Sequence, residues 1–143
     1  MTEDLSLDVI SARAALGLCA PDPLLSEHGI PLPSVSQAAW TLLELHISDI
    51  ASGILRPEEG MRVICAEVIR PAGMAHSMYK RPGESHDIGE LLALEDEYDE
   101  IRRHELRAGS ADQRRPGVDA PVLAEAREWL ARNADRDGLH KLF

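Results

Sequence analysis

The chain has 143 residues and a formal net charge of −10 at pH 7, from 15 Lys and Arg against 25 Asp and Glu. This length is typical of one domain, and the negative charge disfavours binding to nucleic acid or to an anionic membrane surface. No apolar run reaches the roughly 20 residues that span a bilayer. The two cysteines form no disulfide framework or metal motif, and the N-terminus is acidic, unlike a secretory signal. We therefore expect a single domain over residues 1–143, located in the cytoplasm, with no membrane or nucleic-acid partner.

The composition indicates the fold class. Aromatic residues make up only 3% of the chain, and leucine and alanine dominate its apolar residues. Sheets favour β-branched and aromatic side chains, whereas Ala and Leu are strong helix formers. We therefore predict an all-α protein, an irregular bundle of about five helices with a proline-rich connecting strap.

The first two expected elements are a helix and this strap. The helix covers residues 7–16, where Ser6 can cap its start and Gly17 can close its end. The strap covers residues 21–33 and contains four prolines. Because proline lacks an amide donor, an extended segment fits these residues better than a helix. The strap also carries apolar side chains that we expect to lie across the core, namely Leu24, Leu25, Ile30 and Leu32.

The second expected helix, over residues 35–52, has the strongest apolar stripe of the chain. Its start is near Ser34 or Ser36, since a serine side chain at either position can accept a hydrogen bond from a backbone amide of the first turn. Gly53 follows as the expected C-cap, and the stripe of apolar residues continues to Ile54.

The third and fourth expected helices cover residues 57–69 and 87–107. Pro57 is suited to the first position of the third helix, because its missing amide would be unpaired there in any case. Asp87 and Glu90 have the spacing of a capping box at the start of the fourth helix. Leu91, Leu94, Tyr98 and Ile101 form the apolar stripe of this helix, and most of its other residues are charged.

A loop and a fifth helix complete the chain. Residues 109–118 are rich in small and polar residues and predict a flexible loop. The fifth helix is expected over residues 120–132, with Asp119 as its N-cap and Pro121 in its first turn.

One constellation of residues has the spacing of a metal site. Glu97, Glu100 and His104 lie three and four residues apart, so all three side chains can project from one side of a helix. Two carboxylates and an imidazole can bind a divalent metal ion. Such a site needs a further ligand, for which His46, His76 and His86 are available. The alternative is a solvated helix edge on which Glu100 and His104 interact.

The same helix carries the acidic run over residues 95–100. A concentration of like charge costs stability unless neighbours or a partner neutralise it. It either forms a solvated face or docks a basic protein, in which case the charge would speed association. The residues expected to contact such a partner are Asp96, Glu97, Asp99 and Glu100. The arginines that follow lack interleaved aromatic residues, which again disfavours nucleic-acid binding.

Two further reactive side chains lie on apolar stripes. His46, with Asp49 nearby, borders the stripe of the second helix, and no nucleophile is paired with it in the sequence. Cys65 lies on the stripe of the third helix with nothing nearby to stabilise a thiolate. We expect both side chains to pack at the edge of the core, and we assign no catalytic residue.

Residues 50–60, IASGILRPEEG, resemble a segment of small uncharacterised bacterial helical proteins. In those proteins one helix ends in glycine and a proline–acidic–glycine turn starts the next, a Gly-x-x-x-Pro-Glu-x-Gly pattern. Residues 94–98 and 125–130 are similar in kind, so the resemblance covers about residues 47–132. It implies helices and a bacterial cytoplasm, and it implies no activity and no functional residue.

The sequence thus predicts a non-catalytic protein-binding module without a cofactor, whose partner is a basic protein. A bacterial immunity or antitoxin-like role is one concrete form. The alternative is a small metal-assisted enzyme built on Glu97, Glu100 and His104.

Overall fold

The computed structural model describes residues 7–19, 29, 31–73, 86–109 and 113–134. All regular secondary structure in these residues is helical, which confirms the predicted all-α class. None of the described helices is both long enough and apolar enough to cross a membrane. The elements are α1 (Leu7–Ala15), α3 (Val35–Ala51), α4 (Pro57–Ile64) with its π-helical continuation η2 (Cys65–Ile69), α5 (Gly89–Ala108) and α6 (Arg115–Arg132).

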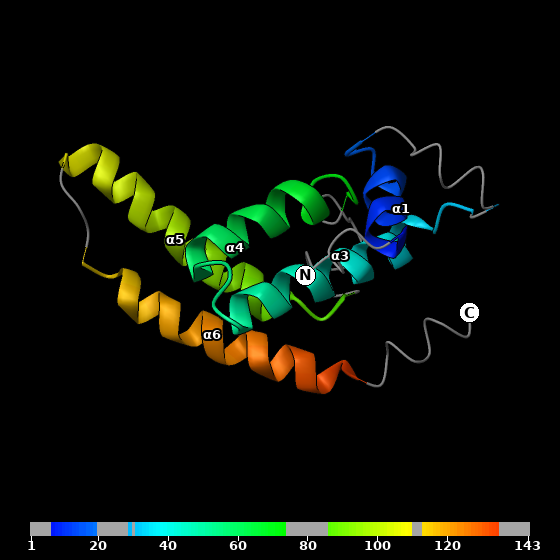
Figure 1. Ribbon diagram of the computed structural model, residues 1–143. Coiled ribbons are helices and arrows are strands. Elements are labelled where there is room, and N and C mark those ends of the chain that lie inside the picture. The colour runs from blue at the N-terminus through cyan, green and yellow to red at the C-terminus, as the bar shows by residue number, and fades with distance from the viewer. Residues whose placement is uncertain (1–6, 20–28, 30, 74–85, 110–112, 135–143) are drawn as a thin grey trace.

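Helix α3 lies at the centre of the bundle. It packs against α1, α4, η2 and α6, while α5 packs against α4 and α6. The end of α5 and the start of α6 spread apart at one end of the bundle, on the left of Figure 1. The candidate site lies between the middle of α5 and the start of α6.

The core is built from the apolar stripes of these helices. Along α3 the repeat of about 3.6 residues per turn brings the large aliphatic side chains to the inner face. Each fully buried side chain of this size contributes about 1.5–3 kcal/mol relative to an exposed one. The largest side chains with no exposed surface are Leu42, Leu43, Ile47, Ile50, Met61, Ile64, Ile88, Leu91, Tyr98, Val68 and Val122.

The start of α3 is a capping box. The Ser34 hydroxyl oxygen accepts a hydrogen bond from the Gln37 amide, and the Gln37 side chain accepts one from the Ser34 amide, both at 3.1 Å. The structure therefore selects Ser34 over Ser36 as the cap. At the other end of α3, Gly53 has a φ of 85°, which turns the chain away from the helix. Ile54 is 72% exposed as a result, and its predicted place in the buried stripe was wrong.

The third predicted helix has two parts. Pro57 is the first residue of α4, as predicted, but α-helical geometry ends at Ile64. Residues 65–69 form a π-helical turn, in which the Arg70 amide donates to the Cys65 carbonyl at 3.1 Å. Such wider turns change which side chains face the neighbouring helix.

Asp87 is not the cap of α5. The helix begins at Gly89, and its N-cap residue Ile88 makes no side-chain cap. Asp87 instead has a φ of 58°, and its carboxylate accepts hydrogen bonds from Arg132 at 2.9 Å and Asn133 at 3.1 Å. The predicted capping box is wrong because this carboxylate joins the start of α5 to the end of α6.

Helix α6 begins five residues earlier than predicted, at Arg115. Pro116 supplies the fixed φ that suits a first helical turn, so the last residues of the predicted loop 109–118 are helical. Asp119 lies inside the helix rather than at its cap, and its carboxylate accepts a hydrogen bond from Tyr98. Asp119 is therefore used for contact between helices.

Most of the predicted strap lies outside the described residues, as do Leu24, Leu25, Ile30 and the predicted cap Ser6. Leu32 is described, and it is 48% exposed. The prediction that this side chain lies across the core was therefore wrong.

Candidate functional site

The helical repeat distributes the acidic run 95–100 around α5. Glu95 and Asp99 are half-buried, and Tyr98 is fully buried between them. Asp96, Glu97 and Glu100 are exposed. Three of the four residues predicted to bind a partner are therefore exposed on α5, and the fourth, Asp99, is half-buried beside them.

The side of α5 that faces α4 carries a network of ion pairs. Arg102 donates to Glu58 of α4 at 2.7 Å and to Glu95 at 2.8 Å. Arg115 of α6 donates to the other oxygen of Glu58 at 2.7 Å, and with two nitrogens to Glu105. These charge-assisted bonds join α4, α5 and α6. This network could not be predicted from the sequence, because its partners are up to 57 residues apart.

Arg102 donates hydrogen bonds to two carboxylates, Glu58 and Glu95, and the pKa values of these two groups are shifted in opposite directions. Burial alone would raise the pKa of Glu58, but hydrogen bonds from Arg115 and Arg102 outweigh it, and the pKa is lowered. Burial raises the pKa of Glu95 despite its bond to Arg102. One oxygen of Glu95 is buried without a hydrogen-bond partner among the described residues. Glu95 and Glu58 are therefore half-buried and bound to arginines of the bundle, which makes them poor candidates for contact with a docking protein.

The buried Tyr98 ties α5 to α6. Its hydroxyl donates a hydrogen bond to Asp119. Burial, and then the Asp119 carboxylate, raise the pKa of Tyr98. The phenol is therefore a neutral donor at physiological pH. This contact joins the two helices next to the acidic face of α5, which is the side of the helix that carries Asp96, Glu97, Asp99 and Glu100.

Arginines of α5 neutralise part of the acidic face of this helix. Arg103 forms an ion pair with Asp99 at 2.6 Å, and Arg107 one with Glu100 at 3.6 Å. Within the described part of the chain, Asp96 and Glu97 form no ion pair. Exposed pairs of this kind contribute only about 0–1 kcal/mol, so a partner can replace them at little cost.

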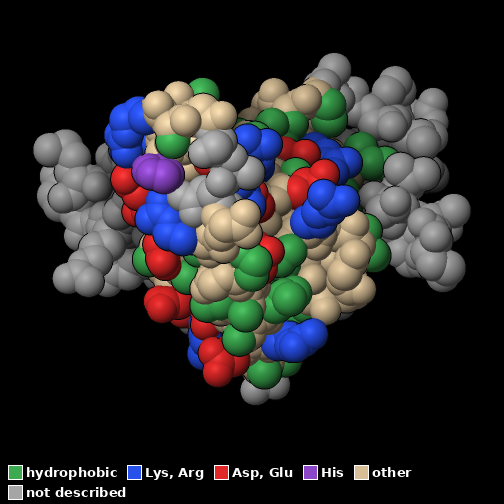
Figure 2. All heavy atoms as spheres, turned by 90° about the vertical axis from the view of Figure 1, so that its left-hand side faces the viewer, with side chains coloured by type: hydrophobic (Ala, Val, Ile, Leu, Met, Phe, Trp, Pro, Cys, Tyr) green, Lys and Arg blue, Asp and Glu red, His purple; other side chains and the backbone are tan. Residues whose placement is uncertain are grey.

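Figure 2 views the bundle from the end where α5 and α6 spread apart. Acidic, basic and histidine side chains alternate along one flank of this face, and hydrophobic side chains gather in its middle and lower part. The face is therefore mixed in charge rather than uniformly acidic. An apolar area beside charged side chains is typical of a protein-binding surface.

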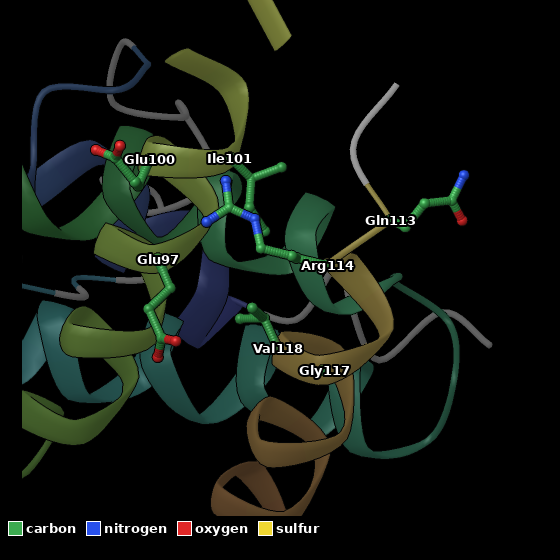
Figure 3. Close-up of a pocket in the computed structure, with 7 residues that line it drawn as sticks. All are labelled: Glu97, Glu100, Ile101, Gln113, Arg114, Gly117 and Val118. Atoms are coloured by element: carbon green, nitrogen blue, oxygen red, sulfur yellow. The ribbon is translucent and has the colours of Figure 1, made fainter. Parts of the chain in front are cut away.

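A pocket of about 410 Å³ lies between the two helices on this side of the molecule. Its lining combines two carboxylates of the acidic face with apolar and polar groups from both helices (Figure 3). Arg114 extends its side chain from the start of α6 toward α5, whereas Gln113 points away (Figure 3). The residues that line the pocket are Glu97, Glu100, Ile101, Gln113, Arg114, Gly117 and Val118.

The pocket brings together two of the three residues of the predicted metal site. Glu97 and Glu100 line it, whereas His104 is exposed on α5 and is not part of the lining. Within the described residues no group of three or more His, Cys, Asp and Glu side chains has a geometry that could hold a metal ion. Of the histidines considered as further ligands, His76 lies outside the described residues.

The other two histidines are buried and hydrogen-bonded. His86 contacts the hydroxyl and carbonyl oxygens of Ser36 at 3.3 and 3.1 Å. His46, 3% exposed, binds Glu67 of η2 at 3.1 Å, and Glu67 also lies 3.5 Å from Arg13. Burial lowers the pKa of His46, although Glu67 opposes this effect. The partner of His46 is thus Glu67 and not Asp49.

Cys65 is half-buried against the core. Burial raises the pKa of its thiol to about 11, and the charge of Glu95 adds to this effect. The thiolate, which is the reactive form of a cysteine, is therefore disfavoured at neutral pH. This agrees with the packing role expected for Cys65.

The roles of the residues that line the pocket can be inferred only from the chemistry of their own side chains. The segment 50–60, on which the resemblance to bacterial helical proteins rests, contributes no lining residue, and that resemblance stays a prediction. No protein-family model, curated protein or solved structure matches this chain.

Proposed function

We propose that this chain is a non-catalytic protein-binding module that docks a basic partner, as an immunity protein or antitoxin does. The docking surface is the exposed side of α5, formed by Asp96, Glu97 and Glu100, together with the pocket beside it. One observation carries the proposal: Glu97 and Glu100 belong both to the acidic run and to the lining of a pocket that contains Ile101 and Val118.

This combination suits the two parts of protein recognition. Exposed charges of one sign speed and orient the encounter with an oppositely charged partner. Most of the binding energy comes from a few side chains that fill pockets and lose water. The net charge of −10 favours a basic partner over long distances, and the pocket offers a place for an anchoring side chain.

The four residues predicted from the sequence differ in how closely an arginine of the chain already pairs with each of them. Asp96 and Glu97 form no ion pair within the described residues, and the pair of Glu100 with Arg107 is long, at 3.6 Å. Asp99 lies 2.6 Å from Arg103 and 3.8 Å from Arg102. We therefore place Asp96, Glu97 and Glu100 in the docking surface and Asp99 at its edge.

The test is a comparison of three immobilised proteins in lysate of the source cell, read by mass spectrometry. They are the wild type, the variant Asp96→Asn/Glu97→Gln/Glu100→Gln, and the control Asp8→Asn/Glu59→Gln/Glu128→Gln. The control removes the same charge from exposed residues on other helices. We expect a basic protein that the wild type and the control retain at equal levels and the α5 variant loses. Equal retention by all three proteins would contradict the proposed surface.

A further inference from the structure

We propose that His46 makes the packing of α1 on the bundle sensitive to pH, because protonation of its imidazole favours the release of α1 from α3. Helix α1 packs on the side of the bundle away from the separated ends of α5 and α6 (Figure 1), so the proposal concerns a surface other than the docking surface on α5. Its basis is a cluster of three ionisable side chains from three elements, namely His46 of α3, Glu67 of η2 and Arg13 of α1.

His46 is a buried ionisable side chain at the place where these three elements meet. It is 3% exposed, and its Nε2 atom lies 3.1 Å from one carboxylate oxygen of Glu67. The same oxygen lies 3.5 Å from Nε of Arg13. Glu67 belongs to the π-helical turn Cys65–Ile69, and such turns are frequent at functional sites. One oxygen atom of Glu67 therefore connects α1 to the imidazole of α3.

The charges of this cluster change sign when His46 is protonated. With a neutral imidazole, the charges of Glu67 and Arg13 cancel, whereas an imidazolium leaves one positive charge in excess. Two cations then share one carboxylate oxygen, and the repulsion between them acts across the contact of α3 with α1. Asp49 of α3 is the other charged group that acts on His46, and it attracts the imidazolium.

Burial decides which form of His46 the packed structure favours. It lowers the pKa of His46, and Arg13 lowers this pKa further, whereas Glu67 and Asp49 raise it without reversing the net shift. The packed structure thus favours the neutral imidazole, and a hydrated site favours the imidazolium. Below the ordinary pKa of 6.5, protons therefore stabilise any state of the protein in which water reaches His46.

Helix α1 is the element that can admit this water with the least loss of packing. It has 9 residues, fewer than the roughly 12–15 that an isolated helix needs in water, so it depends on its contact with α3. Elements with few buried side chains open locally before the rest of a protein unfolds. Because Arg13 reaches Glu67 beside His46, release of α1 opens this cluster to water. The apolar side chains of α1 that become exposed are Val9, Ala12 and Leu16.

The experiment is hydrogen exchange of the backbone amides of the full chain at pH 7.5 and 5.5, with each rate divided by the intrinsic rate at the same pH. We expect residues 11–16 of α1 to be less protected than residues 42–47 of α3 at both pH values, because α1 is released without unfolding of the rest. The protection of α1 should fall severalfold on acidification. The limit is about tenfold for one group whose pKa is near 6.5 in the open state.

The comparison with α3 separates release of α1 from unfolding of the whole chain. Global unfolding also hydrates His46, but it would give α1 and α3 the same protection at each pH. Equal protection of the two helices would therefore overturn the proposal. Protection of α1 that is lower than that of α3 but does not change with pH would overturn it as well, because α1 would then be released without affecting His46.

Two variants test the role of the cluster. His46→Asn removes the titrating group and keeps a polar side chain beside Glu67, so the protection of α1 should no longer depend on pH. Arg13→Gln removes the cation of α1 from a partly exposed position, so the fall on acidification should be smaller than in the wild type. Arg127→Gln, at an exposed position of α6, is the matched control and should behave like the wild type. A fall in His46→Asn or in Arg13→Gln as large as in the wild type would contradict the proposal.

Discussion

Gly60 of α4 lies directly against the side chain of Ile50 of α3. A Cβ atom at Gly60 would overlap the Cγ1 and Cδ1 atoms of Ile50, and both residues are buried. The missing side chain of Gly60 thus allows the backbone of α4 to approach α3 closely. This contact positions α4, and with it Glu58, which binds arginines of both α5 and α6.

Gly60→Ala should therefore destabilise the protein by about 1–3 kcal/mol, the usual cost of overpacking a core. Alanine is the better helix former, so propensity alone predicts the opposite sign. The control is Gly117→Ala, which has open space and should stabilise the protein by up to about 1 kcal/mol. Urea unfolding measures the free energy of unfolding of both variants. Equal stability of the two would show that the contact with Ile50 does not exclude a side chain at residue 60.

Tyr98→Phe should cost about 0.5–1.5 kcal/mol of stability, the typical contribution of one hydrogen bond. The substitution leaves the ring in the core and removes only the donor to Asp119. A double-mutant cycle with Asp119→Ala isolates the pair, since each single variant removes the same bond. An interaction energy near zero would indicate that the hydrogen bond does not stabilise the contact of α5 with α6.

His46 should make stability depend on pH. Burial lowers its pKa in the folded protein below the ordinary value of 6.5, so the unfolded chain binds more protons between these two pKa values. The contribution of neutral His46 to the free energy of unfolding is therefore fully present above pH 6.5. It is lost as the pH falls toward the pKa of His46 in the folded protein, by at most about 1.4 kcal/mol per pH unit. The charged groups that act on His46 are Glu67, Asp49 and Arg13.

The measurement is the free energy of unfolding at pH 7.5 and 5.5 for the wild type and for His46→Asn. The loss on acidification should be smaller in the variant, because it lacks the buried imidazole. Equal losses in the two proteins would rule out His46 as the source.

Metal binding distinguishes a docking protein from the metal-assisted enzyme predicted as the alternative. His104 is not part of the pocket that Glu97 and Glu100 line. We therefore expect calorimetric titration with Zn²⁺ or Mn²⁺ to show no stoichiometric site that depends on His104. Binding of one equivalent in the wild type that His104→Ala abolishes would instead favour the enzyme.

The sequence was sufficient to predict the helices but not all of their ends. Helical periodicity located the stripe of α3 and its buried residues, because burial repeats with the helix. Asp87 and Asp119 have the residue type and spacing of N-caps, yet their carboxylates bind Arg132 and Tyr98 on other helices. A local pattern does not distinguish a carboxylate that caps its own helix from one that binds a distant side chain.

The candidate site was predictable only in part, for the same reason. The period of α5 already places Tyr98 inward and Glu97 outward. The pocket, however, requires Gly117 and Val118 to be helical, and the sequence assigned them to a loop. The half-buried position of Glu95, which binds Arg102, depends on how the helices pack.

The most direct test of the account is the rate at which the captured partner associates with the wild type and with Asp96→Asn/Glu97→Gln/Glu100→Gln. Exposed charges act mainly on the encounter rate, and at 0.15 M salt their reach is only about 8 Å. We predict that the variant associates more slowly and with a weaker dependence on salt, while its unfolding midpoint stays the same or rises slightly. The control Asp8→Asn/Glu59→Gln/Glu128→Gln should associate like the wild type. Unchanged association kinetics in the α5 variant would contradict the account and leave the acidic run as a solvated helix face.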